Sequence, residues 1–152
     1  MRGFFITLFI KQNKWHKHSV LGHTMRVLYH VLKSRDFKFL IPALLHDIGK
    51  PFVAYQDEDD KIENTYSFTD HEEKSYQIIK NWPFISSWSK EIVRYHYLIR
   101  DMDKSYKEGN IQRHDEKLKI WNSLDEIMKE DLRTFLIYDD LGKGTLGKIK
   151  TL

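Results

Sequence analysis

The strongest constraint on the fold is an apolar run that ends in a histidine and an aspartate, His46-Asp47. The apolar residues around this pair recur at helical spacing: Phe37, Leu40, Ile41, Leu44, Leu45 and Ile48. Gly49 and Pro51 follow, which predicts a helix end with Gly49 as a left-handed cap and Pro51 as a breaker. His46 and Asp47 are therefore expected in the last turn of a buried helix. Two polar side chains there need a partner, such as a metal ion.

The composition narrows the classes of protein to consider. The chain has 152 residues, enough for one domain with its own core. It contains no cysteine, which excludes thiolate catalysis and cysteine-bound zinc and fits a reducing, cytoplasmic location. With 25 basic and 22 acidic residues, the net charge is +3, compatible with phosphate-bearing ligands but not with a polycationic nucleic-acid binder. We find no DNA-specific motif.

The termini are expected to be simple extensions of this domain. The apolar block at residues 4–10 is too short to span a bilayer and is followed by no small-residue cleavage site. We expect it to be a strand or helical turn that packs on the domain, without membrane association. The prediction is a single domain over residues 1–152, with an N-terminal extension (1–18), a helical core (19–142) and a mobile basic tail (143–152).

Four further helices are predicted around the one that carries His46. Ser19 is expected to cap a helix to Lys33 that carries His23. The Thr69-x-x-Glu72 pattern predicts a capping box, with His71 opening a helix that ends near Trp82-Pro83. Ser86 or Ser87 should cap a fourth helix through His96 and Ile99. A fifth is indicated by Leu118, Trp121, Leu124, Ile127 and Met128.

The apolar steps then continue through Leu132, Phe135 and Leu136, which places Asp139 on the inward face of a helix that ends near Gly142. Asp140 is the alternative to Asp139, but the helical face favours Asp139. The polar stretches at residues 55–68 and 104–113 are predicted to be loops. The first holds an acidic cluster at residues 57–60 that lacks the Asp-x-Asp-x-Asp-Gly pattern of a calcium loop.

Three segments resemble the HD superfamily of metal-dependent phosphohydrolases. The family's His…His-Asp…Asp signature is matched by His23, His46-Asp47 and Asp139 on successive predicted helices. The similarity extends to residues 22–28 (GHTMRVL), 43–51 (ALLHDIGKP) and 139–142 (DDLG). It implies an all-α fold, a compact domain of five to seven helices around a metal site. Residues 68–80 and Pro51 look most like the HD modules of bacterial tRNA nucleotidyltransferases and RNA-end-healing enzymes.

The resemblance implies a role for each of these residues. His23, His46, Asp47 and Asp139 would hold a first metal ion, and Asp47 would bridge to a second held by His71 and His96. Imidazole and carboxylate ligands suit two divalent transition ions such as Mn, Ni, Co or Fe, with Zn also compatible. Lys50 and Arg26, one turn after His23, are candidate phosphate or leaving-group clamps, and Arg100 is a weaker one.

Three functions fit this set of residues. The first is a phosphodiesterase or phosphomonoesterase acting on a nucleotide or RNA-end phosphate, such as a 2′,3′-cyclic phosphate or a cyclic nucleotide, through a metal-activated water. The GYP motif of cyclic-di-GMP phosphodiesterases is absent. The second is an HD-type di-iron oxygenase, whose ligand set is the same. The third is a non-catalytic nucleotide-binding protein, which the full ligand set disfavours. The sequence leaves the oligomeric state open.

Overall fold

The computed structural model describes Gln12 and residues 18–144. Over that part of the chain the all-α class is confirmed, with one isolated antiparallel bridge between Tyr55 and Ser67. The helices are α2 (Val20–Lys33), a 3-10 turn η1 (Phe37–Phe39), α3 (Leu40–Leu45), α4 (Lys50–Val53), α5 (Glu58–Glu63), α6 (His71–Ile79), α7 (Ser87–Tyr95), α8 (Leu98–Lys107), α9 (Ile111–Ser123) and α10 (Glu126–Gly142). The apolar block at residues 4–10 and residues 145–152 of the predicted tail lie outside the described residues.

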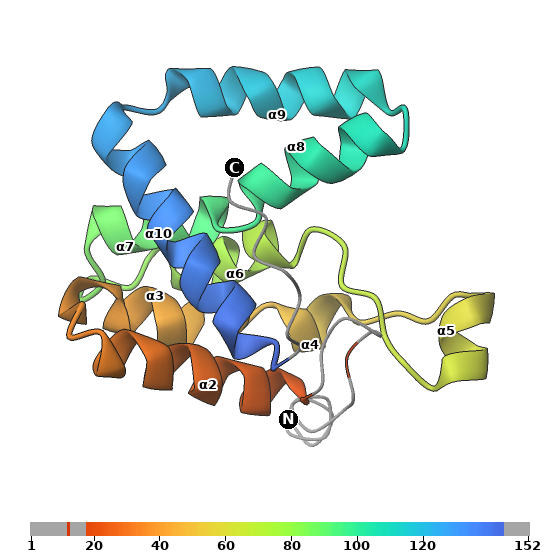
Figure 1. Ribbon diagram of the computed structural model, residues 1–152, viewed down its shortest axis with the longest axis horizontal. Coiled ribbons are helices and arrows are strands. Elements are labelled where there is room, and N and C mark those ends of the chain that lie inside the picture. The colour runs from red at the N-terminus through yellow and green to blue at the C-terminus, as the bar shows by residue number, and fades with distance from the viewer. Residues whose placement is uncertain (1–11, 13–17, 145–152) are drawn as a thin grey trace.

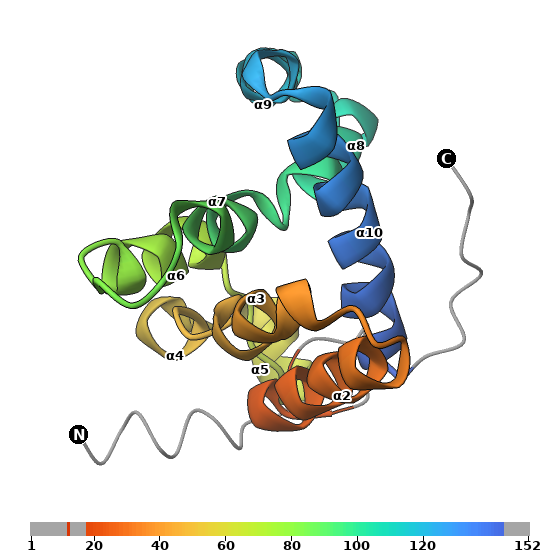
Figure 2. The ribbon, with the colours of Figure 1, turned by 90° about the vertical axis from the view of Figure 1, so that its left-hand side faces the viewer.

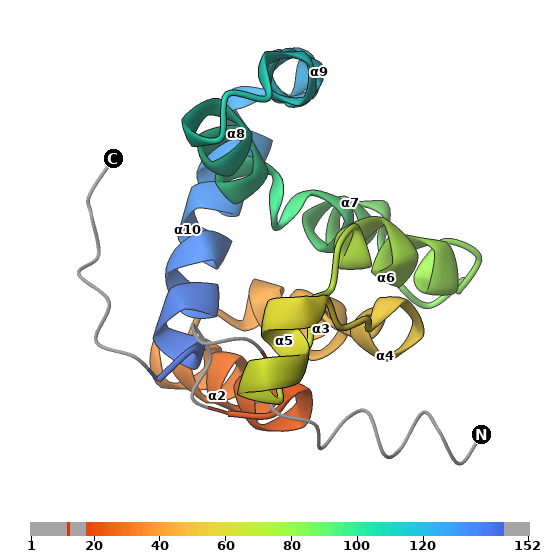
Figure 3. The same ribbon diagram turned by 90° about the vertical axis from the view of Figure 1, so that its right-hand side faces the viewer.

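The arrangement brings the N-terminal and C-terminal helices together. α10 descends from the α8–α9 end of the molecule and packs along α2 (Figure 1). α3 lies on α2, and α6 pairs with α7 on the other side of α3 (Figure 2). α8 and α9 form a hairpin that stands apart from α2 and α3 (Figure 3). No helix among the described residues is long and apolar enough to cross a membrane.

Two apolar clusters hold these layers together. The larger joins α2, η1, α3, α7 and α10 through buried residues: Val27, Val31, Phe39, Ala43, Ile92, Met128, Leu132, Phe135 and Tyr138. The smaller joins α3, α6 and α7 through Leu45, Ile79, Ile85 and Val93. The ring of Phe135 lies 5.6 Å from that of His46 and 6.3 Å from that of His96. The larger core therefore ends directly against the predicted histidines.

Several helix ends follow the sequence signals. The Ser19 hydroxyl accepts a hydrogen bond from the Gly22 amide at the start of α2. The Ser86 hydroxyl likewise accepts a hydrogen bond from the Ser89 amide at the start of α7. Of the two predicted caps, Ser86 and Ser87, the cap is therefore Ser86. α2 ends at Lys33 and α10 at Gly142, as predicted.

The prediction for Gly49 was wrong in its physical reason. α3 ends at Leu45, and Gly49 is a right-handed residue (φ −78°, ψ −24°) that precedes α4 as its N-cap. Pro51 is the second residue of α4, so it lies in the first turn of a helix and does not act as the predicted breaker. A Cβ on Gly49 would lie 2.5 Å from both the His71 carbonyl oxygen and the Ser75 amide nitrogen. The glycine is thus required by the close approach of α6 rather than by a left-handed cap.

The start of α6 also differs from the prediction. Asp70, not Thr69, is the N-cap, and it adopts a left-handed conformation (φ 55°) without a capping hydrogen bond. The Thr69 hydroxyl instead contacts the Tyr55 hydroxyl at 3.0 Å. The Asp70 carboxylate accepts a hydrogen bond from Arg113 on α9 at 3.0 Å. At the start of α6, the expected hydrogen bond from the cap to the helix is absent, and Asp70 instead pairs with Arg113 from a distant segment.

Both predicted loops contain helix. Within residues 55–68, Asp57 and Asp60 form a capping box at the start of α5, and acidic side chains in a first turn favour the helix. Residues 104–113 hold the end of α8 and the start of α9, which Asn110 caps. The predicted fourth helix breaks after Tyr95, and the fifth divides at Leu124, where the Asp125 carboxylate caps α10.

Candidate metal centre

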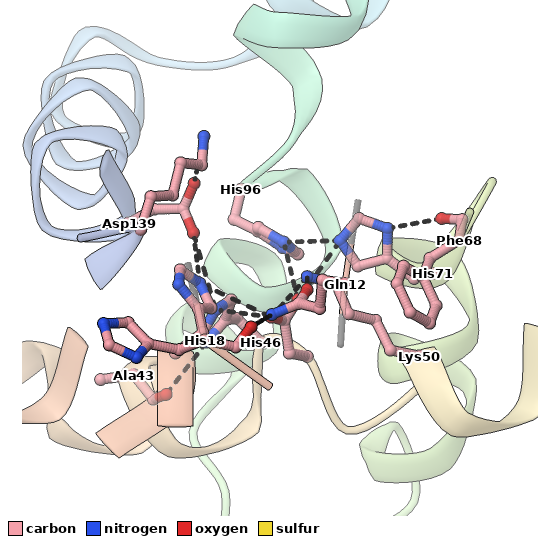
Figure 4. A network of polar contacts seen from close by, with 12 residues as sticks. Gln12, His18, Ala43, His46, Lys50, Phe68, His71, His96 and Asp139 are labelled. Carbon is pink, nitrogen blue, oxygen red and sulfur yellow. Dashed lines mark hydrogen bonds and ion pairs between the residues drawn. The ribbon is translucent and has the colours of Figure 1, made fainter. Parts of the chain in front are cut away.

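Six buried polar side chains meet where the layers converge. His23 comes from α2, His46 and Asp47 from the turn after α3, His71 from the first residue of α6, His96 from the end of α7, and Asp139 from the last turn of α10. Each is at most 7% exposed. Figure 4 shows His46, His71, His96 and Asp139 pointing toward one another from different elements. The structure thus brings together all six residues that the sequence suggested as ligands.

The first group lies around His23 and His46. The two Nε2 atoms are 3.2 Å apart, and His23 Nε2 is 2.9 Å from Asp139 Oδ1. Asp47 Oδ2 lies 3.6 Å from His23 Nε2 and 3.3 Å from His46 Nε2. Ligands bound to one ion at about 2.1 Å are themselves about 3 to 3.5 Å apart. The ligand atoms of His23, His46 and Asp47 therefore lie close enough together to hold one ion, and Asp139 Oδ1 adjoins them, 2.9 Å from His23 Nε2 and 3.7 Å from His46 Nε2.

The second group uses the other oxygen of Asp47. Oδ1 lies 3.4 Å from His71 Nε2 and 3.9 Å from His96 Nε2, and the two imidazole nitrogens are 3.2 Å apart. Each of the trios His23–His46–Asp47 and Asp47–His71–His96 could hold a metal ion. Asp47 belongs to both, with one oxygen directed to each.

The hydrogen bonds of the histidines fix which nitrogen faces the centre. Nδ1 of His46 lies 3.0 Å from the Ala43 carbonyl oxygen, that of His71 lies 2.9 Å from the Phe68 carbonyl, and that of His96 lies 2.7 Å from the Val93 carbonyl. A carbonyl only accepts, so Nδ1 carries the proton and the Nε2 lone pair of a neutral ring points inward. The short Nε2–Nε2 contact between His71 and His96 then joins two acceptors, an arrangement that a cation between them would stabilise.

The residues pass a further test of fit to a metal. Asp47 Oδ1 accepts no hydrogen bond from the described residues, although the side chain is only 2% exposed. Lys50 Nζ lies 2.7 Å from Oδ2 as an ion pair. A buried carboxylate with unsatisfied oxygens is expensive unless a charge balances it. Imidazole and carboxylate donors together suit divalent transition metals.

The comparisons with known proteins agree with this geometry. The family model described as HD domain matches residues 20–127, more than two thirds of the chain. The chain belongs to the HD-domain family. That family is generally one of metal-dependent phosphohydrolases. No curated protein and no solved structure matches the chain.

Within this HD-domain protein, the matched span ends before α10 is complete. Asp139 lies beyond residue 127, yet it approaches His23 more closely than any other carboxylate of the centre does. Gly142 makes this approach feasible, because a Cβ there would lie 2.4 Å from Val27 Cγ2 and 3.0 Å from His23 Cε1. A glycine one turn after Asp139 therefore allows α10 to lie directly on α2 beside the first group.

The histidines of the two groups differ in their electrostatics. Burial lowers the pKa of His71 to about 4, with the Lys50 charge acting in the same direction. Burial also lowers the pKa of His96 to about 3, and electrostatic repulsion from His46 and His71 acts in the same direction. Burial alone would lower the pKa of His46, but the charges of Asp47 and Asp139 outweigh it and raise that pKa. The second pair of histidines is thus held neutral, the form that binds metals.

Both carboxylates of the centre are held in their charged form. Burial by itself would raise the pKa of Asp47, but His46 and Lys50 keep it well below the usual range. Burial would likewise raise the pKa of Asp139, but the hydrogen bond to His23 and the Lys143 charge keep it low. The centre therefore presents two anionic carboxylates together with the neutral imidazoles of His71 and His96, a combination that favours a cation.

A polar pocket of about 800 Å³ opens onto the second group. Its floor is formed by Asp47, His71, His96 and Asp139, and its walls by residues 67–72 and one face of α8. The cationic groups nearest the floor are Lys50, Arg100 and Lys143. A pocket of this volume accommodates a ligand of nucleotide size.

Of the three residues predicted to bind the phosphate or the leaving group, Lys50 and Arg100 line the pocket and Arg26 does not. Lys50 lines the pocket and is buried (5% exposed) against Asp47. Arg26 is exposed on α2 and does not line this pocket. Arg100 does line it, with Nε 3.6 Å from Asp139 Oδ2 and Nη2 paired with Asp140. The structure therefore favours Arg100 over Arg26 as the arginine of the site.

Sequence reasoning missed residues in and beside the pocket, among them Lys143, Tyr97 and Gln12. Lys143 lies four residues after Asp139, a helical spacing that could have indicated it. Tyr97 follows His96, and its ring lies 5.4 Å from that of His71. Gln12 contacts Lys50 from a segment before α2, and nothing in the local sequence indicates this.

Proposed function

We propose that this HD-domain protein is a phosphohydrolase that uses two divalent transition-metal ions, such as Mn, Ni, Co or Fe, to cleave a nucleotide or RNA-end phosphate. The observation that supports the proposal best is the placement of Asp47, with one oxygen toward each histidine pair at the floor of a nucleotide-sized pocket. His23, His46, Asp47 and Asp139 would hold one ion, and Asp47, His71 and His96 the other.

Bound divalent ions would supply a hydroxide from water at neutral pH and neutralise phosphate oxygens. The protein's own side chains account for the other requirements. Asp47 orients the two groups relative to each other because it belongs to both. Arg100 has a buried Nε that donates no hydrogen bond to the described residues, and it faces the pocket. A guanidinium in this position suits recognition of a phosphate oxygen.

Within this reaction class, the substrates to test first are 2′,3′-cyclic phosphates and nucleoside monophosphates. The pocket is wide enough for a base and ribose, and the aromatic rings of Phe68 and Tyr97 are among its walls. The ions Mn and Ni are the natural choices for reconstitution because nitrogen ligands disfavour Mg.

The test is phosphate-ester hydrolysis by metal-loaded protein, with Asp47→Ala as the decisive variant. We expect turnover by the native protein and loss of about 10³-fold or more in kcat/KM for Asp47→Ala. Asp115→Ala, an exposed position on α9, is the matched control and should leave kinetics unchanged. Near-native hydrolysis by a folded Asp47→Ala protein would refute the site.

A further inference from the structure

We infer that Gln12, from the segment that precedes α2, is a positioning residue that holds the Lys50 ammonium in the active pocket. This inference rests on the proposed function, because it assigns Gln12 a part in the same site. Gln12 lies before residue 20, where the HD family match begins. The site is then completed by a residue that the HD family match does not include.

The contact is buried on both sides. The Gln12 side chain is 0% exposed and Lys50 is 5% exposed. Lys50 Nζ donates to Gln12 Oε1 at 2.6 Å, and Gln12 Nε2 donates to the His18 carbonyl at 3.4 Å (Figure 4). The amide of Gln12 thus has its oxygen committed to Lys50 and its nitrogen anchored to the chain just before α2.

A buried ammonium needs partners for its donors, because its desolvation is costly. Lys50 has three such partners within reach: Asp47 Oδ2 at 2.7 Å, Gln12 Oε1 at 2.6 Å, and the ring of Phe68 with its centroid at 5.5 Å. Asp47 also belongs to both candidate metal groups, so its oxygens cannot serve Lys50 alone. Gln12 is the neutral oxygen acceptor among the three and belongs to neither group.

Because Gln12 supplies one of the two oxygen partners of Lys50, it helps to set the position of the Lys50 ammonium. With the amide oxygen in place, the ammonium stays beside Asp47 and faces the pocket that Lys50 lines. Without it, the flexible lysine stem is free to turn toward solvent or to compete for the Asp47 oxygens. Misplacement of a charged group by about 1 Å is enough to slow a reaction by about 10²-fold.

Two measurements test the proposal, and the first does not depend on turnover. Acylation of Lys50 by N-hydroxysuccinimidyl acetate, mapped by mass spectrometry, should be slow in the native protein. It should rise about tenfold or more in Gln12→Leu, which keeps the bulk of the side chain but removes the acceptor. Gln12→Glu keeps an acceptor oxygen and should leave Lys50 protected. Gln56→Ala, which removes a glutamine bonded to the Thr65 carbonyl outside the pocket, is the control.

The second measurement is a double-mutant cycle on hydrolysis. Gln12→Leu should lower kcat/KM by about tenfold or more in the native background, yet cause no further loss in a Lys50→Met background. Equal losses in both backgrounds would show a merely structural role and overturn the proposal, as would unchanged acylation of Lys50 in a folded Gln12→Leu protein. If no phosphate ester is turned over but Gln12→Leu exposes Lys50, the proposed function fails while the assigned contact is supported.

Discussion

His71 and His96 face each other with their Nε2 atoms 3.2 Å apart, while Nδ1 of each points to a backbone carbonyl. Two neutral imidazoles in this arrangement present lone pairs to the same space. Such a contact is unfavourable between the rings alone and becomes favourable when both bind a cation. The relationship separates this pair from an ordinary buried histidine, which satisfies its second nitrogen with a donor.

The first prediction concerns metal stoichiometry. We expect two Mn or Ni ions per chain after reconstitution, and one in His71→Ala or His96→Ala, because each variant removes a ligand from the second group only. Elemental analysis after gel filtration measures the ratio. His114→Ala, which removes a histidine bonded to the Met102 carbonyl, should retain both ions. A value of one ion in the native protein, unchanged in both ligand variants, contradicts the two-metal centre.

The second prediction concerns the stability of the metal-free protein in acid. The pKa values of His71 and His96 are lowered to about 4 and about 3, so the unfolded chain binds more protons than the folded one below about pH 6.5. Stability should therefore fall as the pH drops from 6.5 toward 4. We expect a loss of about 2 kcal/mol per histidine between pH 7 and pH 5.

Urea unfolding in the presence of a chelator at the two pH values measures this loss. The raised pKa of His46 acts in the opposite direction, because a proton bound in the folded state adds stability below pH 6.5. The net loss is therefore smaller than the two histidines alone would give. His96→Gln, which does not titrate, should lose less than the native protein. Equal losses in the two proteins would point to another group.

The sequence identified the parts of this structure that depend on local patterns. Ser19 and Ser86 cap their helices as predicted, and the apolar periodicity of α10 distinguishes Asp139 from Asp140. Asp139 faces the histidines, while Asp140 pairs with Arg100 and Lys143. Helical spacing is enough for such distinctions because it fixes which side chains share a face.

The features that were missed depend on contacts between distant segments. Gly49 reads locally as a helix cap, but its role is set by the backbone of α6. Asp70 adopts a left-handed conformation and pairs with Arg113, forty-three residues away. Arg26 and Arg100 each lie one turn beyond a histidine, so sequence spacing alone does not indicate which of the two belongs to the site. Only the three-dimensional arrangement shows which one faces the pocket.

The third prediction tests the packing reason for Gly49. Gly49→Ala should destabilise the protein by about 1–3 kcal/mol, because the added Cβ meets backbone atoms of α6 at 2.5 Å that cannot easily move. Metal affinity should also fall, since His71 is one of the residues that must shift. Thermal unfolding and metal titration measure the two effects. Gly22→Ala is the comparison, because its Cβ meets only side-chain atoms, with His18 Cβ nearest at 3.1 Å, and we expect a smaller loss. Similar losses at the two positions would contradict the close-approach argument.

The fourth prediction compares the two arginines that follow a histidine by one turn. Arg100 lies in the pocket beside Asp139, whereas Arg26 is exposed on α2. If Arg100 binds a phosphate oxygen, Arg100→Met should lower kcat/KM by about 10- to 100-fold, with metal content unchanged. Arg26→Met should alter neither kinetics nor stability by more than about 0.5 kcal/mol.

Steady-state kinetics on a phosphate ester that the native protein turns over decides between these outcomes. Arg100 also pairs with Asp140, so its removal leaves that carboxylate with Lys143 alone. Asp140→Asn supplies the control for this effect: it weakens the same ion pair but keeps the guanidinium in the pocket. A loss for Arg100→Met that Asp140→Asn reproduces in full would assign the arginine a structural part. A loss confined to Arg100→Met, with Arg26→Met unaffected, identifies Arg100 as the group that binds the phosphate.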